Sequence, residues 1–260
     1  MTDHEHDHGP RHDGDHSDWV PHFDSEFWDE HYGSAPALWS GRPNPVLVDE
    51  VADLPPGRAL DVGSGEGADA LWLAGRGWLV LGTDVSQVAL DRAAAAVDAG
   101  GLSDQVIWVQ HDLLAWTPPA RSFDLVSAQF FHLPADIRPQ VYGRLADAVA
   151  PGGTFLVVAH HPSDLDTTMS RPPVEELFFT ADELAEQLDD EWDVQVCEAR
   201  PRTQVDPNGR EVAITTPCSR HVVGQADAVA ASSRRRSAAI TVSWSVVRHM
   251  SGNEAARNDP

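Results

Sequence analysis

The residues with the clearest chemical meaning form a glycine-rich turn, DVGSGEGAD, that begins at Asp61. Gly63, Gly65 and Gly67 let the backbone pass close to a ligand and aim N–H groups at it from the start of a helix. The first two of these glycines, with Ala68, also satisfy the dinucleotide pattern GxGxxA, so the turn alone leaves a dinucleotide open. Asp61 favours another ligand, because its carboxylate can face a cationic amino group, whereas a pyrophosphate site has no use for that charge.

Two further carboxylates follow along the chain, Asp84 in GTDV and Asp112 in HDL. Asp84 is placed to accept hydrogen bonds from both hydroxyls of a ribose, and Asp112 to accept one from an adenine amino group. With Asp61, they would suit a ligand that carries an ammonium group, a ribose and an adenine, and no phosphate.

Alternating strand and helix patterns surround these acids. Strands are predicted at 58–62, 78–83, 106–110, 123–129, 154–159 and 192–198, and helices at about 45–53, 68–74, 87–99, 135–149 and 180–188. Such alternation predicts a doubly wound α/β fold, with a mainly parallel sheet covered by helices on both faces. The acids lie at the ends of successive strands, so we expect them to meet at the carboxyl edge of the sheet, where such folds bind ligands.

DVGSGEGAD, TDVS, HDLL, FDLVSAQ and APGGTF, in this order, resemble the motifs of class I S-adenosylmethionine-dependent methyltransferases, and the similarity extends over about residues 23–214. The resemblance implies a Rossmann-like seven-stranded sheet of order 3-2-1-4-5-7-6 and S-adenosylmethionine as cofactor. It also implies contacts from Asp61 and the three glycines to the methionine part, from Asp84 and Val85 to the ribose, from Asp112 and Leu113 to the adenine, and from Gln129 to the methionine amine.

Aromatic residues before the first strand resemble the lid of small-molecule methyltransferases of the tellurite and thiopurine types. Residues 19–56 are therefore expected to form an N-terminal helical lid. Tyr32 and Trp39 could stack beside the sulfonium, an interaction worth about 0.5–2 kcal/mol, and Arg42 could hold the methionine carboxylate. An aromatic stripe that only packs the helix explains Tyr32 and Trp39 equally well.

The methyl acceptor is less clearly encoded, since transfer from a sulfonium depends mainly on alignment and needs little acid–base help. His132 is the best candidate for a catalytic base, followed by His160 and His161. A histidine near a strand end also commonly serves packing alone. The motif (D/N)PP(Y/F), typical of methyltransferases that act on DNA bases or glutamine, is absent, which favours a small-molecule acceptor.

The composition of the chain argues against several classes of partner and of chemistry. The formal net charge of −23 argues against nucleic acid or an anionic membrane as partner. All 18 basic residues are arginines, which excludes Walker-type phosphate loops, Schiff-base chemistry and the Tyr-Lys pair of short-chain dehydrogenases. Cys197 and Cys218 form no CxxC pair, and no apolar run could act as a membrane span or signal segment. A cytoplasmic enzyme is expected.

The two ends of the chain differ from this core. Residues 1–18 are rich in His and Asp, which predicts a disordered tail, with any divalent metal binding being incidental. Strand seven should begin near residue 210, but the alternating pattern breaks down after Ile214. Residues 215–260 are therefore interpreted as an atypical C-terminal tail, either a frameshift product or a genuine appendage in which 240–247 replaces the strand.

Two other functions are compatible with parts of the sequence. A nicotinamide-dependent oxidoreductase would share the topology, although Asp61 and the missing Lys argue against it. A non-catalytic metal-binding protein on a methyltransferase scaffold would explain the His-rich tail and the unusual C-terminus.

Overall fold

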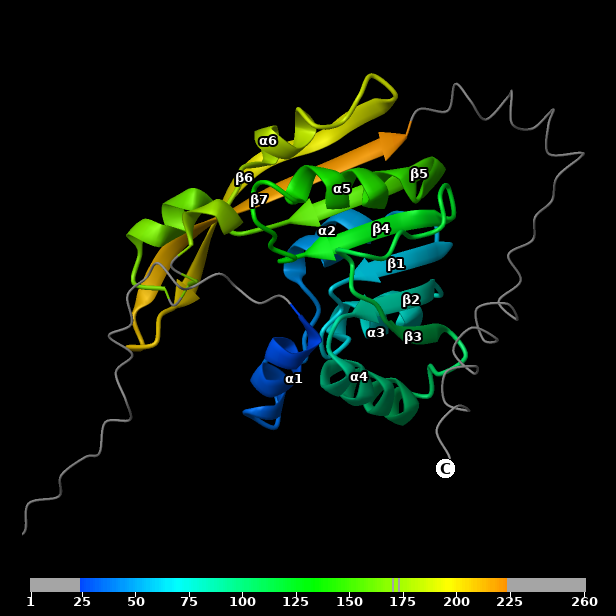
Figure 1. Ribbon diagram of the computed structural model, residues 1–260, viewed down its shortest axis with the longest axis horizontal. Coiled ribbons are helices and arrows are strands. Elements are labelled where there is room, and N and C mark those ends of the chain that lie inside the picture. Colours follow the sequence, from blue (N-terminus) through cyan, green and yellow to red (C-terminus); the bar gives the residue numbers. More distant parts are fainter. Residues whose placement is uncertain (1–23, 170, 173, 224–260) are drawn as a thin grey trace, which may run out of the picture.

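The computed structural model describes residues 24–169, 171–172 and 174–223, so the predictions for residues 1–18 and 224–260 lie outside the described part. Seven strands form one sheet of order β3-β2-β1-β4-β5-β7-β6, as the sequence predicts (Figure 1). The strands are β1 (Arg58–Val62), β2 (Leu79–Asp84), β3 (Val106–Gln110), β4 (Phe123–Gln129), β5 (Val149–Val158), β6 (Trp192–Val205) and β7 (Glu211–Val223).

The first five strands are parallel, and β7 runs antiparallel to both of its neighbours, β5 and β6. Right-handed crossovers through helices produce such an order. The helices are α1 (Ser25–Gly33), α2 (Pro45–Val51), α3 (Ala68–Gly75), α4 (Gln87–Gly100), α5 (Arg138–Asp147) and α6 (Ala181–Ala185), with short 3-10 turns η2 (Pro162–Asp166) and η3 (Glu175–Leu177).

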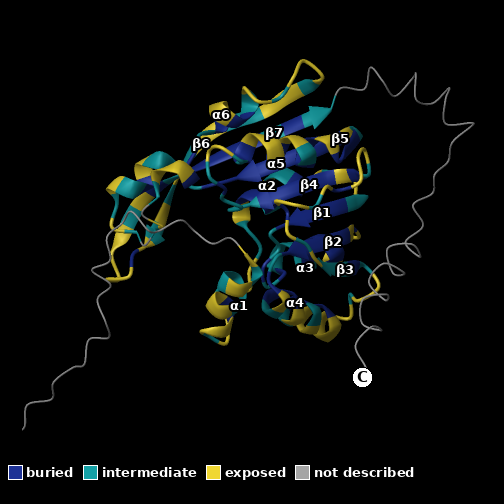
Figure 2. Cartoon of the chain, in the orientation of Figure 1, coloured by how far each residue is buried: buried dark blue, intermediate teal, exposed yellow. Residues whose placement is uncertain are grey.

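The strands at the centre of the sheet are mostly buried (Figure 2), and apolar residues form two core clusters against the sheet. One core cluster gathers around Leu60, Val126 and Phe155, and the other around Ala59, Leu125 and Leu156. Consecutive residues of a strand point to opposite faces, so runs such as Ala59-Leu60 serve both clusters, as is typical of parallel strands covered on both sides. This buried frame fixes the strand ends from which the candidate site residues extend.

The prediction that the strand pattern ends at Ile214 is wrong, because β7 continues to Val223 as an inner strand. Its buried residues here are small or polar, namely Thr216, Pro217, Cys218, Ser219 and His221, which hides the strand from a search for alternating apolar residues. Pro217 is tolerated because β5 pairs only with residues 218–222 of β7, so the missing N–H falls just beyond the end of β5. A frameshift at residue 215 is not needed to complete the sheet.

Several element boundaries also differ from prediction. The helix expected to reach Val149 ends at Asp147, and β5 begins at Val149, so the APGG segment lies inside the strand, where the pairing register with β4 shifts. The sixth strand extends to Val205 rather than to residue 198. Residues 199–205 and 211–217 thereby form a two-stranded arm that continues past the paired segment of β5 (Figure 1).

Candidate functional site

The glycine-rich turn joins β1 to α3 and has left-handed backbone at all three glycines, with φ of +63° at Gly63, +52° at Gly65 and +81° at Gly67. An L-residue rarely adopts this conformation. A Cβ at Gly67 would lie 2.6 Å from the ring of Trp108, so this glycine also permits close packing. The N–H of Gly65 donates to Asp84 Oδ2 at 2.8 Å, which ties the turn to the end of β2.

Three carboxyl groups lie together at this turn, with Asp61 and Asp84 buried and Asp69 half-buried. Burial raises the pKa of Asp61 well above its ordinary range, and the neighbouring Asp69 and Asp84 raise it further. Burial also raises the pKa of Asp69, to about 6, and that of Asp84. Asp84 accepts from the N–H groups of Gly65 and Ser86, whereas Asp61 Oδ2 is buried with no hydrogen-bond partner.

This arrangement fits the cationic end of S-adenosylmethionine. Burying carboxylates side by side is unfavourable unless a positive charge or a proton offsets them. An ammonium group can supply that charge and can donate to the free oxygen of Asp61. Sequence reasoning missed Asp69, which lies in the first turn of α3 and accepts from the N–H of Asn44 at 2.6 Å. The only signal was an acid two residues after Gly67, the last glycine of the turn.

The predicted ribose and adenine contacts have different surroundings. Asp84 is buried, and its neighbour Val85 is half-buried and accepts from Gln110 through its carbonyl at 2.8 Å. Asp112 is exposed, and its Oδ1 accepts from the N–H of Leu114 at 2.8 Å, which shapes the loop after β3. Leu113 is buried. The structure therefore brings Asp84 to the glycine turn, while a role for Asp112 and Leu113 with adenine stays a prediction.

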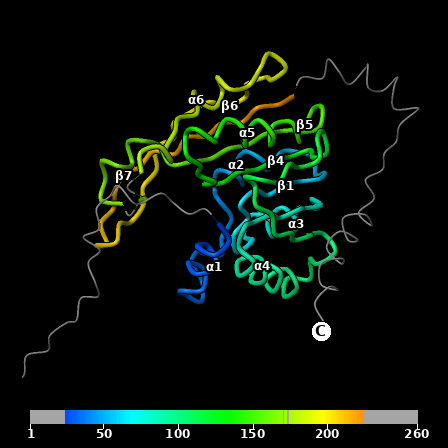
Figure 3. Tube along the Cα trace, in the orientation of Figure 1, coloured from blue at the N-terminus to red at the C-terminus, as the bar shows by residue number. Residues whose placement is uncertain are grey.

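The lid, described from residue 24, crosses the carboxyl ends of the strands on its way from α1 to α2 (Figure 3). Glu66 Oε2 accepts from the N–H groups of Leu38 at 3.2 Å and Trp39 at 3.1 Å, and Glu66 Oε1 pairs with Arg92 at 2.8 Å. Arg92 also donates to the carbonyls of Tyr32 at 2.8 Å and Ala35 at 2.7 Å. Sequence reasoning missed this pair, which fastens the lid over the glycine turn.

Tyr32 is buried and its hydroxyl accepts from Trp39 Nε1 at 3.2 Å. A Cβ at Gly65 would lie 2.8 Å from that hydroxyl and 3.6 Å from the indole nitrogen, so both aromatic residues cover the turn directly. Burial, the first cause, and the charge of Asp84 raise the pKa of Tyr32 above its ordinary range, so the phenol stays protonated. The structure thus brings Tyr32 and Trp39 to the predicted cofactor region.

Gln129, at the end of β4, is linked to the lid. Its Oε1 accepts from Asn44 Nδ2 at 2.8 Å, and its Nε2 donates to Ser127 Oγ at 2.9 Å. Arg42 lies two residues before Asn44 with an exposed side chain, so its role with a carboxylate stays a prediction.

Beyond Gln129 lies a second cluster, built from the ends of β4 and β5. The rings of His132 and His160 stack with centroids 4.8 Å apart, and Phe130 lies 4.7 Å from His160. Phe130 has a φ of +55°, which is uncommon for a bulky residue and is the kind of strain found at functional sites. Phe131 extends the other way, with its ring 3.0 Å from the Cβ position of Gly63, so the cluster adjoins the glycine turn.

Both histidines are neutral at physiological pH. Burial lowers the pKa of His132 to about 4 and that of His160 to about 2. His132 Nδ1 lies 3.0 Å from the carbonyl of Leu177, which can only accept, so Nδ1 carries the hydrogen and Nε2 carries the lone pair. That Nε2 is buried without a partner. His161, by contrast, caps η2 through Ser163 and takes no part in the stacked pair.

Charged residues that sequence reasoning missed complete this cluster. Asp164, on η2, is buried and its Oδ2 lies 3.3 Å from Arg171 and 3.7 Å from His160 Nδ1. Arg202, on the arm, places its guanidinium carbon 5.3 Å from the centroid of Phe130. No local motif marks these residues, because they meet only once the arm folds over the end of β5.

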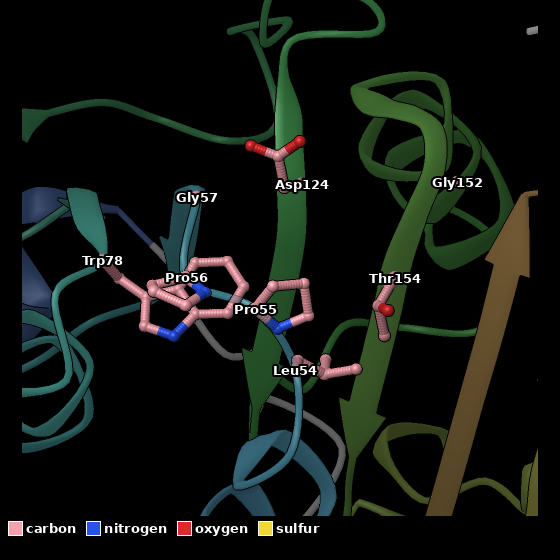
Figure 4. Close-up of a pocket in the computed structure, with 8 residues that line it drawn as sticks. All are labelled: Leu54, Pro55, Pro56, Gly57, Trp78, Asp124, Gly152 and Thr154. Carbon is pink, nitrogen blue, oxygen red and sulfur yellow. The ribbon is translucent and has the colours of Figure 1, made fainter.

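A hollow lies at the amino ends of the strands, at the edge of the sheet opposite the glycine turn (Figure 4). Its lining residues are Leu54, Pro55, Pro56, Gly57, Trp78, Asp124, Gly152 and Thr154. Its single acid, Asp124, already accepts from the N–H of Arg58 at 2.8 Å, so the hollow offers no free charged group. Among the described residues, no group of three or more His, Cys, Asp or Glu side chains could hold a metal ion, and no helix is suited to crossing a membrane.

Comparison with known proteins agrees with this geometry. A family model for a methyltransferase domain matches residues 59–153, which run from the second residue of β1 through the glycine turn to the first half of β5. The probable thiol methyltransferase 2 of Arabidopsis thaliana is 28% identical over 153 residues, or 57% of this chain and 66% of that protein. The 2-heptyl-1-hydroxyquinolin-4(1H)-one methyltransferase of Mycobacteroides abscessus is 29% identical over 160 residues, or 56% of this chain and 70% of that protein. The match thus spans about two thirds of the length of these curated relatives.

Solved structures share the fold. One, reported for the conversion of a disulfide bond into a thioacetal group during echinomycin biosynthesis, has a TM-score of 0.65 at 24% identity, covering 81% of this chain and 97% of that chain. TehB from Haemophilus influenzae has a TM-score of 0.57 at 19% identity, covering 76% of this chain and 66% of that chain. The Rossmann-like architecture predicted from the sequence is therefore confirmed.

Proposed function

We propose that this chain, which belongs to the class I S-adenosylmethionine-dependent methyltransferases, transfers a methyl group from that cofactor to a small-molecule nucleophile. The observation that carries the proposal is the unpartnered buried Oδ2 of Asp61, beside Asp69 and Asp84, at a turn of three left-handed glycines. S-adenosylmethionine supplies an electrophilic methyl group on a sulfonium when bound.

The residues of the turn bind and orient the cofactor in this proposal. Asp61, with Gly63, Gly65 and Gly67, holds the methionine part, and Gln129 approaches the methionine amine. Asp84 and Val85 face the ribose, and Asp112 and Leu113 face the adenine. Tyr32 and Trp39 lie over the turn, where they exclude water and place aromatic rings near the sulfonium. Arg42 holds the methionine carboxylate.

The stacked histidine cluster forms the acceptor side of the site. His132 Nε2 offers a lone pair in a buried setting and accepts the proton that the nucleophile loses on methylation. Orientation of the acceptor by Phe130, His160 and Phe178 supplies the larger contribution, since an aligned displacement gains up to roughly 7–11 kcal/mol in good intramolecular analogues.

A small acceptor is supported by the relatives, which are named for a thiol and for a hydroxyquinolone. The strong negative charge of the chain weighs against nucleic acid as substrate. A cytoplasmic location is part of the proposal and agrees with two cysteines that form no disulfide, Cys197 and Cys218.

The experiment is transfer of labelled methyl from S-adenosylmethionine to a panel of small thiols and phenols. The wild type is expected to label at least one acceptor, and Asp61→Asn to lose most of the activity because cofactor binding weakens. Asp53→Asn, a substitution in the loop after α2, is the matched control and should behave as the wild type. Absence of labelling by the wild type across the panel, together with absence of cofactor binding, would refute the proposal.

A further inference from the structure

Arg202 is the residue of the acceptor side that the proposed reaction leaves unexplained. Its side chain is half-buried, its guanidinium lies over the Phe130 ring at 5.3 Å, and its Nε is buried without a hydrogen-bond partner. An arginine held in this way without a carboxylate is unfavourable in a folded protein, because a desolvated guanidinium needs an anion or acceptor oxygens.

The charges around Arg202 do not neutralise it. Asp164 is the acid that faces it, but Asp164 Oδ2 already lies 3.3 Å from Arg171, and Oδ1 accepts from the N–H of Thr215 at 3.0 Å. Arg171 lowers the pKa of Arg202 as a like charge, second only to burial, while Asp164 raises it less. Asp164 therefore acts on Arg202 through its charge alone, in a chain whose net charge is −23.

The lowered pKa values of the neighbouring His132 and His160 are consistent with the same excess of positive charge. After burial, which is the largest cause, the charges of Arg138 and Arg171 lower the pKa of His132, and those of Arg171 and Arg202 lower that of His160. The cluster is thus an electropositive, aromatic-lined region at the acceptor side.

We propose that the methyl acceptor is an anion-bearing small molecule whose carboxylate pairs with Arg202 while its nucleophilic X–H group donates to His132 Nε2. The inference rests on the proposed function, and it assigns the acceptor class. Both anchors lie close to the same ring, since Arg202 is 5.3 Å and the His132 ring 6.4 Å from the Phe130 centroid. The acceptor is therefore expected to lie against the Phe130 ring, between the guanidinium and the imidazole.

The proposed transfer accounts for the methyl group, the acceptor proton and the charges. The sulfonium S–CH3 bond breaks as the X–CH3 bond forms, the cofactor leaves as a neutral thioether, and the X–H proton passes to His132 Nε2 and then to solvent. The acceptor carboxylate stays ionised throughout. Its negative charge beside the histidine favours the imidazolium, so the bound acceptor raises the basicity of His132, which is otherwise low.

Matched pairs of thiols test the inference. Mercaptoacetate and 4-mercaptobenzoate carry the anion, and 2-mercaptoethanol and 4-mercaptobenzamide carry the same nucleophile without it. Each is titrated calorimetrically into the full chain saturated with S-adenosylhomocysteine, and each is assayed as a methyl acceptor. The variants are Arg202→Gln, Arg202→Lys and, as matched control on the same arm, Arg210→Gln, whose side chain is exposed.

The wild type and Arg210→Gln should prefer at least one anionic thiol over its neutral partner by about 10-fold or more in Kd and in kcat/KM. Arg202→Gln should lose this preference while keeping the binding of S-adenosylhomocysteine, and Arg202→Lys should restore part of it. Equal affinity for both members of each pair in the wild type, or an unchanged preference in Arg202→Gln, would overturn the inference. If S-adenosylhomocysteine itself fails to bind, the proposed function fails, and the same titrations on the chain alone still decide whether Arg202 binds anions.

Discussion

Replacing Glu66 with Ala should release the lid without unfolding the sheet. The carboxylate accepts the N–H groups of Leu38 and Trp39 and pairs with Arg92 at 2.8 Å, where the two side chains are 12% and 27% exposed. Hydrogen bonds to a charged group contribute about 1.5–3 kcal/mol each in buried settings, but the bond to Trp39 is exposed, which reduces the total. A loss of about 2–3 kcal/mol is expected, which raises the open population of the lid roughly 30- to 150-fold.

Hydrogen exchange followed by mass spectrometry measures this directly. Amides of residues 34–44 should exchange faster in Glu66→Ala, while those of β1 and β4 should keep their protection. Glu30→Ala, which removes an exposed acid of α1, is the matched control and should leave the pattern unchanged. Equal exchange of residues 34–44 in the wild type and Glu66→Ala would show that this carboxylate does not hold the lid.

Three further outcomes are expected. Affinity for S-adenosylmethionine should fall as the pH drops through about 6, because the pKa of Asp69 is raised to about 6 and only its charged form attracts the cationic cofactor. Calorimetric titrations of Asp69→Asn should show a weaker dependence of this affinity on pH. His132 has a pKa of about 4 in the folded protein against an ordinary 6.5, so the unfolded chain gains a proton first and stability falls as the pH drops below 6.5. Chemical denaturation should show that the free energy of unfolding falls between pH 7.5 and 5.5 by about 1.4 kcal/mol less in His132→Gln than in the wild type. An identical fall in both proteins would contradict the assignment. Ser219→Pro should destabilise the chain by about 3 kcal/mol or more in the same assay, because it removes an N–H from an inner strand, whereas Ala213→Pro, on the arm beyond β5, should cost much less.

Local signals were sufficient to predict much of the fold. The bounds of β1, β3 and β4 match the predicted ranges, because turn residues and acids border short apolar runs. The inner strand β7 was missed beyond Ile214 because its buried side chains there are small or polar, while its backbone pairs with β5 and β6. The amino-acid composition of a segment does not show which strands its backbone N–H and C=O groups will form hydrogen bonds with.

Some residues of the candidate site could be predicted from local sequence, and others could not. Asp61 and Asp84 lie at the carboxyl ends of β1 and β2, so the strand order alone brings them to one edge of the sheet. Glu66 and Arg92 could not be matched from sequence, since their pairing depends on how the lid folds back over the turn. Arg202 lies farther still from its partners in sequence, on an arm whose length the strand pattern underestimated.

The most direct test of the central claim is calorimetric titration of the full chain with S-adenosylmethionine, in parallel with Asp61→Asn. The expected result is one-to-one binding that weakens at least about 10-fold in the variant, because a charge-assisted hydrogen bond to the cofactor ammonium is lost. Binding of a nicotinamide dinucleotide with no heat from S-adenosylmethionine, or equal affinity in the wild type and Asp61→Asn, would contradict it.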